Sequence, residues 1–135
     1  MDEYLDAAIA DDVAVVCLTH VNFRTGAMHD LDRVSARVRE AGAVMVWDLS
    51  HSAGSIPIDL RASGAQLATG CGYKFLNGGP GAPSFVFVAE ELHDHLAQPL
   101  TGWLGHASPF EFSPEYEPAP GVARVLCGTP SILSM

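Results

Sequence analysis

The stretch Gly70-Cys71-Gly72-Tyr73-Lys74-Phe75-Leu76-Asn77-Gly78-Gly79-Pro80-Gly81 holds the only lysine of the sequence, Lys74. It joins two strand-like runs, Gln66–Cys71 and Ser84–Val88, which places it in a loop at one end of a predicted sheet. An amine among glycines and apolar side chains is poorly hydrated, and this favours the neutral form that attacks carbonyl groups. The stretch therefore predicts Schiff-base chemistry at Lys74. The alternative is an incidental lysine in a glycine-rich turn, and the surrounding sequence decides between the two.

A second stretch places a carboxylate where open α/β sheets bind their ligands. The apolar run Val44–Trp47 predicts a buried strand that ends directly at Asp48, and His51 follows shortly after it. An aspartate can pair with the ring nitrogen of a pyridinium, while a lysine further along the chain holds the aldehyde carbon of the same ring. Asp48 followed by Lys74 is therefore the pairing that a pyridoxal phosphate enzyme requires.

The chain up to residue 98 predicts an α/β fold with a mostly parallel sheet and crossover helices. The run Val13–Leu18 has the length of a buried strand, and the polar Thr19 and Asn22 follow its carboxyl end. The run Asp30–Ala41 has apolar residues on one face, so it predicts a helix that links two strands in a right-handed βαβ unit. Weaker signals predict the end of a helix before Asp12, a short extended segment at Ile56–Leu60 and a short helix at Ala89–Leu96.

The composition changes after Gln98. Prolines and glycines recur from Pro99 onwards, which leaves little room for long helices or strands. We therefore divide the chain into residues 1–98, part of a cofactor-binding domain, and residues 99–135, a loop-rich C-terminal arm.

Several motifs, taken together, resemble the kynureninases. The similarity runs from about Val13 to the last residue with the motifs in the family's order, so it is far more specific than any single pattern. Kynureninases are fold-type I pyridoxal phosphate enzymes of the class V aminotransferase group, and they are considerably longer than this chain. The resemblance therefore implies an internal or partial fragment of the large domain of such a fold-type I enzyme. The motifs are Asp48-Leu-Ser-His51-Ser-Ala-Gly, Gly72-Tyr73-Lys74-Phe-Leu-Asn-Gly-Gly-Pro-Gly-Ala-Pro, Gly102-Trp103-Leu-Gly-His106 and Cys127-Gly-Thr129-Pro.

The resemblance also implies roles for individual residues. Lys74 is the implied catalytic residue, which binds the cofactor aldehyde and carries the proton taken from the substrate, and Asp48 pairs with the ring nitrogen. His51 contacts the ring substituents, and Tyr73 contacts the phosphate. Some kynureninases place asparagine where this chain has threonine at position 129. The implied cofactor-binding set is Thr19, Asp48, His51, Tyr73, Lys74, Trp103 and Thr129, the last two reaching the phosphate across the interface of a homodimer.

The implied reaction is hydrolysis of L-kynurenine or 3-hydroxykynurenine to L-alanine and anthranilate or 3-hydroxyanthranilate, in tryptophan catabolism and NAD biosynthesis. The family's arginine for the substrate carboxylate and its early phosphate loop are not visible, and we expect them outside this chain. Two alternatives stay open. A cysteine desulfurase or another class V enzyme shares the frame from Asp48 to Lys74, but desulfurases usually carry histidine where this chain has Tyr73. The other alternative is an inactive truncated product.

Composition excludes several other classes of protein. A formal net charge of -9 disfavours nucleic acid and anionic membrane as partners, since both bind basic surfaces. The three cysteines form no closely spaced pair, so they predict neither a zinc site nor a disulfide framework. No metal is expected at the histidines either, because they lack carboxylate or cysteine partners at ligand spacing. Without a signal-like or membrane-spanning run, the sequence predicts a cytoplasmic protein.

Overall fold

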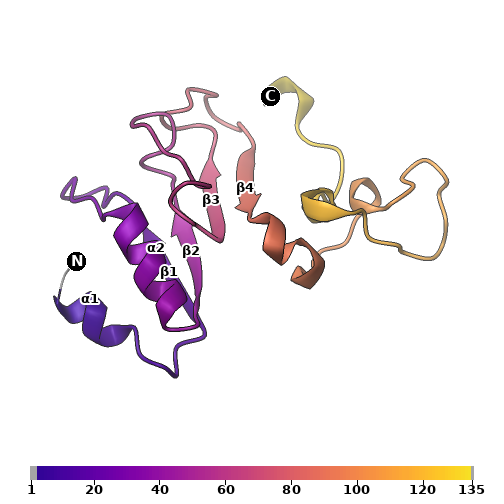
Figure 1. Cartoon of the computed structure of the whole chain (residues 1–135). Helices are drawn as coiled ribbons and strands as arrows, with labels where there is room; N and C mark the ends of the chain where they lie inside the picture. Colours follow the sequence, from indigo (N-terminus) through magenta and orange to yellow (C-terminus); the bar gives the residue numbers. More distant parts are fainter. Residues whose placement is uncertain (1–2, 135) are drawn as a thin grey trace.

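The structure is a computed structural model that describes residues 3–134. One sheet has its four strands in the order β1-β2-β3-β4, and the arm lies beyond β4, on the far side from β1 (Figure 1). The strands are β1 (Val15–Thr19), β2 (Val44–Asp48), β3 (Leu67–Cys71) and β4 (Ser84–Val88).

The first three strands are parallel and the fourth is antiparallel. β1 pairs with β2 so that Thr19 lies opposite Asp48, and β2 pairs with β3 so that Asp48 lies opposite Thr69. β4 returns antiparallel to β3, and the lysine loop joins the two strands at one end of the sheet. The predicted α/β class with a mostly parallel sheet is confirmed.

Helix α2 (Leu31–Glu40) links β1 to β2, as the apolar spacing predicts. Asp30 caps its first turn by accepting a hydrogen bond from the main-chain N–H of Arg33 at 3.0 Å. Gly42 follows the last turn at a φ of +75°, a left-handed conformation that glycine adopts without strain. Both ends of the helix therefore lie within one residue of the predicted range Asp30–Ala41.

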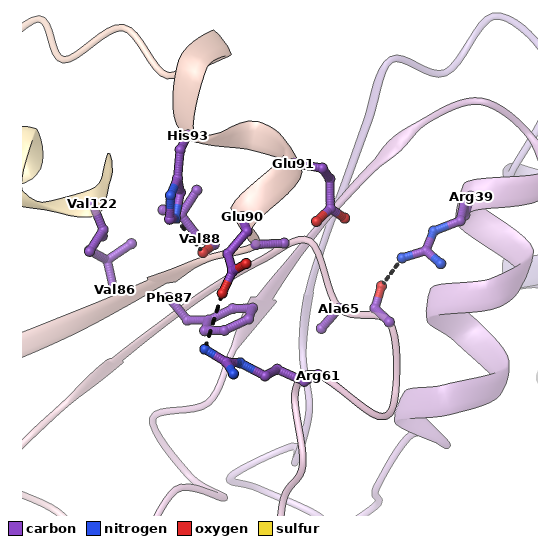
Figure 2. Close-up of a pocket in the computed structure, with 12 residues that line it drawn as sticks. Arg39, Arg61, Ala65, Val86, Phe87, Val88, Glu90, Glu91, His93 and Val122 are labelled. Carbon is purple, nitrogen blue, oxygen red and sulfur yellow. Dashed lines mark hydrogen bonds and ion pairs between the residues drawn. The ribbon is translucent and has the colours of Figure 1, made fainter. Parts of the chain in front are cut away.

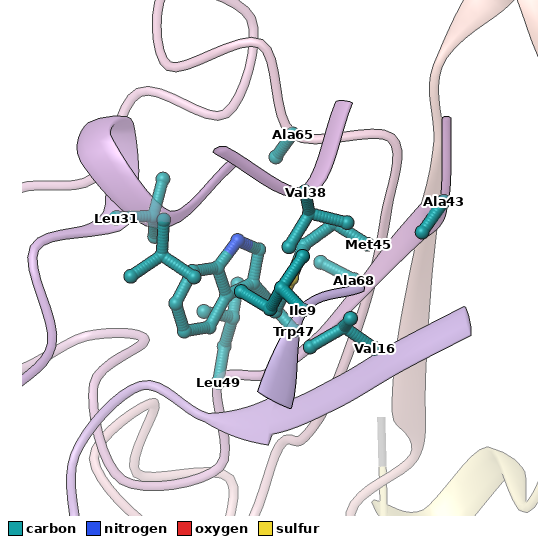
Figure 3. Packing of buried hydrophobic residues seen from close by; sticks show 11 residues of the cluster. Ile9, Val16, Leu31, Val38, Ala43, Met45, Trp47, Leu49, Ala65 and Ala68 are labelled. Carbon is teal, nitrogen blue, oxygen red and sulfur yellow. The ribbon is translucent and has the colours of Figure 1, made fainter. Parts of the chain in front are cut away.

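The hydrophobic core lies between α2 and one face of the sheet. Trp47 on β2 has no exposed surface, and its indole lies amid the other core side chains (Figure 3). Its N–H donates to Ser35 Oγ on α2 at 3.0 Å, so the buried nitrogen is paired. This packing fixes β2, and with it the strand end at Asp48. The core comprises Ile9, Val16, Leu31, Val34, Val38, Ala43, Met45, Trp47, Leu49, Ala65 and Ala68.

The opposite face of the sheet is largely exposed in the described chain. Val15 on β1 and Val86 on β4 are 56% and 44% exposed, and Cys17 is exposed too. The prediction that Val13–Leu18 forms a fully buried strand is therefore wrong, because Val16 alone is buried within β1. Continuous apolar runs are typical of strands covered on both faces, whereas β1 is an edge strand with one face covered.

The weaker predictions hold in part. The opening helix is α1 (Glu3–Ala8), and residues 56–60 form neither helix nor strand. The predicted helix at Ala89–Leu96 is a 3-10 helix, η1 (Glu90–His95), which has tighter turns than an α-helix. The arm has short 3-10 turns, as its prolines and glycines indicate, namely η2 (Trp103–Gly105), η3 (Gly121–Val125) and η4 (Ile132–Ser134).

No helix within residues 3–134 is long and apolar enough to cross a membrane. No three histidine, cysteine or acidic side chains in this range are grouped closely enough to hold a metal ion.

Candidate functional site

The carboxyl end of the parallel strands gathers the first group of predicted site residues. Thr19 and Asp48 are the last residues of β1 and β2 and lie opposite each other in the ladder. β3 ends at Cys71, so the chain enters the lysine loop at the same end of the sheet. Parallel pairing therefore brings Thr19, Asp48 and the loop of Lys74 to one edge, which is where such sheets bind ligands.

Asp48 is held as a carboxylate by its surroundings. The main-chain N–H of Ser50 donates to Asp48 Oδ1 at 2.8 Å. Partial burial by itself would raise the pKa of Asp48, but the hydrogen bonds from Ser50, together with smaller electrostatic contributions from His51 and Lys74, outweigh it and lower the pKa below its ordinary value. An ionised carboxylate at this edge is suited to pair with a protonated ring nitrogen.

Lys74 and His51 are in direct contact. Lys74 Nζ lies 3.0 Å from His51 Nε2 and 5.6 Å from the centre of the Tyr73 ring. The loop is more exposed than its composition predicts, since Tyr73, Phe75 and the next residue, Leu76, are each about half exposed. Lys74 itself is half-buried, so a poorly hydrated amine stays a prediction, and the neighbour that engages the lysine is an imidazole.

The close approach of two loops makes this contact possible. A Cβ added at Gly54 would lie 2.6 Å from the carbonyl oxygen of Phe75, so the turn after His51 and the lysine loop touch through their main chains. Gly72 and Gly78 are similarly crowded by the main chain or side chains of the same loop. Glycines at these positions allow the two loops to approach each other and the lysine loop to fold back on itself, which larger residues would prevent.

Thr19 and Asn22 have local structural partners. The Thr19 hydroxyl donates to the carbonyl of Val21 at 3.1 Å, and Asn22 Oδ1 accepts main-chain hydrogen bonds from Arg24 and Thr25. Both side chains therefore satisfy main-chain groups where β1 turns, which was the alternative to a cofactor contact. A cofactor contact at Thr19 remains a prediction.

The arm holds the second group of predicted residues, Trp103 and Thr129. The Trp103 ring packs edge-on against Phe110 at 5.7 Å and is 42% exposed, and Thr129 is exposed. A Cβ at Gly128 would lie 3.8 Å from Trp103 Nε1, so Thr129 follows a residue beside that ring. The middle of the arm projects past β4, away from β1 and β2 (Figure 1), whereas Ser134 near its end would lie 3.5 Å from a Cβ at Gly81 in the lysine loop. A shared cofactor site for the two groups remains a prediction.

Two residues of the site were not found by sequence reasoning. Ser50 supplies the hydrogen bond to Asp48, and Phe23 stacks on the His51 ring with centroids 5.6 Å apart and planes at 28°. Serine after a strand-ending aspartate is a recognisable turn signal, so Ser50 was within reach of the sequence. Nothing in the sequence indicates that Phe23 meets a residue on another loop.

A pocket of about 530 Å³ lies elsewhere, between α2, β4 and η1 (Figure 2). Three of its charged side chains have partners, because Arg61 is 3.4 Å from Glu90 and Arg39 donates to the Gly64 carbonyl at 2.5 Å. None of the predicted site residues lines it. We therefore regard it as a junction between elements and not as the reaction site.

The family model of the class-V aminotransferases matches residues 1–134 of this chain. The chain belongs to the class-V aminotransferase family. The enzymes of this family use pyridoxal phosphate, and the described residues fit it. A class-V site needs a carboxylate for the ring nitrogen and an amine for the aldehyde, and Asp48 and Lys74 are the groups at this edge of the sheet that could supply them.

Curated relatives within the class-V family narrow the resemblance. A kynureninase of Burkholderia mallei is 54% identical over 131 residues, and one of Pseudomonas fluorescens is 53% identical over 133 residues. These matches cover 97% and 98% of this chain, but the chain spans only 32% of the length of either relative. The predicted resemblance to kynureninases is confirmed.

Solved structures agree with the class-V fold. The apo cysteine desulfurase of Thermococcus onnurineus superposes with a TM-score of 0.76 at 24% identity, covering 95% of this chain and 31% of that one. The Escherichia coli cysteine desulfurase CsdA gives a TM-score of 0.77 at 20% identity, covering 98% and 32%. At these identities the likeness supports the fold, and the predicted fragment of a fold-type I enzyme is confirmed at that level.

Proposed function

We propose that this chain is a segment of a kynureninase, which hydrolyses L-kynurenine or 3-hydroxykynurenine to L-alanine and the matching anthranilate. The observation that carries the proposal is the contact of Lys74 Nζ with His51 beside an ionised Asp48. The identity of 54% to curated kynureninases supports the substrate class. The reaction places the enzyme among hydrolases of carbon–carbon bonds, in tryptophan catabolism and NAD biosynthesis.

The residues of this chain would hold pyridoxal phosphate from several sides. Asp48 pairs with the ring nitrogen, Lys74 holds the aldehyde carbon, and His51 meets the ring substituents. Thr19 and Tyr73 complete the contacts within the chain. When bound, the cofactor withdraws electrons from the bonds at the substrate α-carbon.

The chain's own groups then manage protons and charge. Asp48 stays ionised because of Ser50, His51 and Lys74, so it keeps a proton on its partner nitrogen. Once its amine is free of the aldehyde, Lys74 is the base that takes the α-proton of the substrate and returns it. His51 keeps the lysine amine in place, since its Nε2 lies 3.0 Å away. The roles of His51 and Lys74 both need the close contact between the turn of His51 and the lysine loop.

The arm supports a homodimer. Trp103 has an indole N–H and Thr129 has a hydroxyl, both of which suit a phosphate oxygen, and both lie on the arm, which extends past β4 (Figure 1). Exposed apolar residues accompany them, including Leu100 at 71% and Phe110 at 75%. We propose that the arm, residues 99–135, reaches the cofactor site of a second subunit and completes its phosphate contacts. The remaining large-domain residues, 1–98, carry the other half of each site.

The decisive experiment uses a segment-exchange enzyme, defined as Pseudomonas fluorescens kynureninase in which this chain replaces its matching segment. It is supplied with pyridoxal phosphate and L-kynurenine, and anthranilate fluorescence is followed over time. We expect turnover within about tenfold of the unmodified relative, because the exchanged segment supplies the same groups. Loss of turnover in a folded, cofactor-loaded segment-exchange enzyme would contradict the proposal.

The 135-residue chain alone is the companion sample. We expect weak cofactor binding and little hydrolysis, because a phosphate dianion needs more donors than the described site gathers and the substrate carboxylate lacks an arginine. Turnover at the rate of the complete relative would show that this expectation is wrong.

A substrate comparison separates kynureninase from the cysteine desulfurases that share its fold. The segment-exchange enzyme is given L-cysteine, and sulfide is measured beside anthranilate from kynurenine. We expect anthranilate without sulfide. A cytoplasmic location and the exclusion of nucleic acid and membrane partners remain predictions from composition, and fractionation of cells that express the protein tests them.

A further inference from the structure

We propose that Phe23 is a positioning residue, which holds the imidazole of His51 against the amine of Lys74. The inference rests on the proposed function, because it assigns a task within the same cofactor site. It joins two contacts, the stack of Phe23 on His51 and the approach of His51 to Lys74.

An imidazole does not keep one orientation by itself. Its χ2 torsion is broad, so the ring can rotate out of any one plane. A partial rotation of the His51 ring would move Nε2 from in front of Lys74, and the 3.0 Å contact would be lost. Within residues 3–134, the ring atoms of His51 make one hydrogen bond, to Lys74, and one aromatic contact, to Phe23.

The Phe23 ring restricts that rotation. The two ring centroids lie 5.6 Å apart and the planes differ by 28°, so the phenyl covers one face of the imidazole. A half-turn of His51 about χ2 would return the ring to the same plane and keep the stack, but a partial rotation that moves Nε2 away from Lys74 would tilt the imidazole face away from the phenyl and weaken the stack. Stacked aromatic pairs stabilise beyond simple area burial, so the stacked orientation is favoured.

Phe23 is itself held by the main chain of its turn. Asn22 Oδ1 accepts hydrogen bonds from the N–H groups of Arg24 at 2.9 Å and Thr25 at 3.2 Å. The main chain of Asn22 bonds Ala27 at 2.8 Å, and Gly26 takes a φ of +70° to close the turn. Phe23 is 73% exposed, so the hydrophobic core does not hold its side chain. The aromatic contact of its ring is with His51, on another loop.

The consequence falls on Lys74. A protonated lysine can only donate hydrogen bonds, so in that state Nε2 of His51 accepts and the imidazole proton is on Nδ1. A fixed ring keeps this acceptor in front of the amine. Without Phe23 the acceptor is in place for a smaller share of the time, and the amine is freer to meet reagents from solvent.

The test measures the reactivity of Lys74 without cofactor or substrate. Lys74 is the only lysine, so acetylation by a limiting amount of acetic anhydride is followed by mass spectrometry of its peptide. The parent chain is compared with Phe23→Ala, Phe23→Leu and Phe23→Tyr, first as the 135-residue chain and then within the segment-exchange enzyme. We expect Lys74 to react about two- to tenfold faster in the alanine and leucine variants and at the parent rate in the tyrosine variant.

A double-mutant cycle identifies the route of the effect. His51→Ala should raise the rate of acetylation by a similar factor, and the double variant Phe23→Ala, His51→Ala should react no faster than His51→Ala alone. Met28→Ala is the matched control, because Met28 pairs with Val21 at the base of the same turn and is 61% exposed. Its Lys74 should react at the parent rate.

Several results would overturn the inference. Lys74 reacting at the parent rate in Phe23→Leu, or additive effects of Phe23→Ala and His51→Ala, would show that Phe23 does not act through His51. If the alanine variant fails to fold, the leucine and tyrosine variants carry the comparison. Failure of the segment-exchange enzyme to bind pyridoxal phosphate would contradict the proposed function, and the acetylation rates would still report on Phe23.

Discussion

The carboxyl end of the sheet and the C-terminal arm hold their site residues in different ways. Asp48 ends a strand that Trp47 anchors in the core, and Lys74 sits in a loop packed main chain to main chain against the turn of His51. Trp103 lies in a short 3-10 turn and is 42% exposed, and Thr129 lies in an irregular segment. The fold of one chain therefore fixes the positions of Asp48 and Lys74. The positions of Trp103 and Thr129 depend on what the arm contacts.

The largest expected effect concerns the first group. Lys74→Ala in the segment-exchange enzyme should abolish both covalent attachment of the cofactor at position 74 and turnover, because no other lysine of this chain can substitute. Borohydride treatment and mass spectrometry of the loop peptide check attachment, and anthranilate fluorescence checks turnover. Lys74→Arg is the control that keeps the positive charge, and it should be equally inactive. Cofactor still reducibly linked within this segment would contradict the assignment.

Asp48 should give a smaller but still large effect. Asp48→Ala should leave the cofactor bound while turnover falls about a hundredfold to a thousandfold, because the ring nitrogen loses the charge that keeps it protonated. Cofactor absorbance after dialysis measures binding, and anthranilate release measures turnover. Asp59→Ala is a suitable comparison, since Asp59 caps main-chain groups of a distant turn. Near-parent turnover in Asp48→Ala would point to another partner for the nitrogen.

These effects show which parts of the site the sequence could predict. The apolar runs that end at Asp48 and Cys71 predict both strand ends, and parallel pairing then brings Asp48 and Lys74 to one edge. The contact of Lys74 with His51 depends on how two loops approach each other, and neither loop encodes the other's position. For the same reason Phe23 was missed, since its partner lies on a different loop.

Burial of the strands was predicted less well than their positions. The run Val13–Leu18 is apolar throughout, yet β1 lies at the edge of the sheet and exposes Val15 and Cys17. An apolar run shows that both faces of a strand are suited to packing, but in the described residues only one face of the sheet is covered. For the arm, the prolines and glycines correctly predict irregular structure, but they do not indicate what the arm contacts.

The two tryptophans sharpen the comparison, because each region has one. Trp47→Ala should lower the free energy of unfolding by about 3–5 kcal/mol, since it removes a fully buried ring from the core. Trp103→Ala should lower it by about 1 kcal/mol or less, because the half-exposed ring loses one edge contact with Phe110. Urea denaturation followed by circular dichroism measures both. Equal losses would mean that the arm is as well packed as the sheet.

The smallest expected effect is a pH dependence of stability at His20, next to the site. His20 is 4% exposed, its Nδ1 lacks a hydrogen-bond partner among the described residues, and its ring meets Trp47 edge-on at 5.6 Å. Burial lowers the pKa of His20 and the positive charge of His29 acts the same way, while the His29 main chain acts in the opposite direction. The folded protein therefore binds this proton less readily than the unfolded chain does.

The sign of the effect follows from proton linkage. As the pH falls below about 6.5, the unfolded chain takes up a proton at His20 before the folded chain does, so stability is lost from there down to the lowered folded pKa. Asp48 acts in a separate window, because its lowered pKa costs stability only as the pH falls below about 3.8. Urea midpoints at pH 7.5 and 5.5 should therefore differ less in His20→Phe than in the parent. His95→Gln, on the exposed side of η1, should keep the parent difference, and an unchanged difference in His20→Phe would assign the pH dependence to another group.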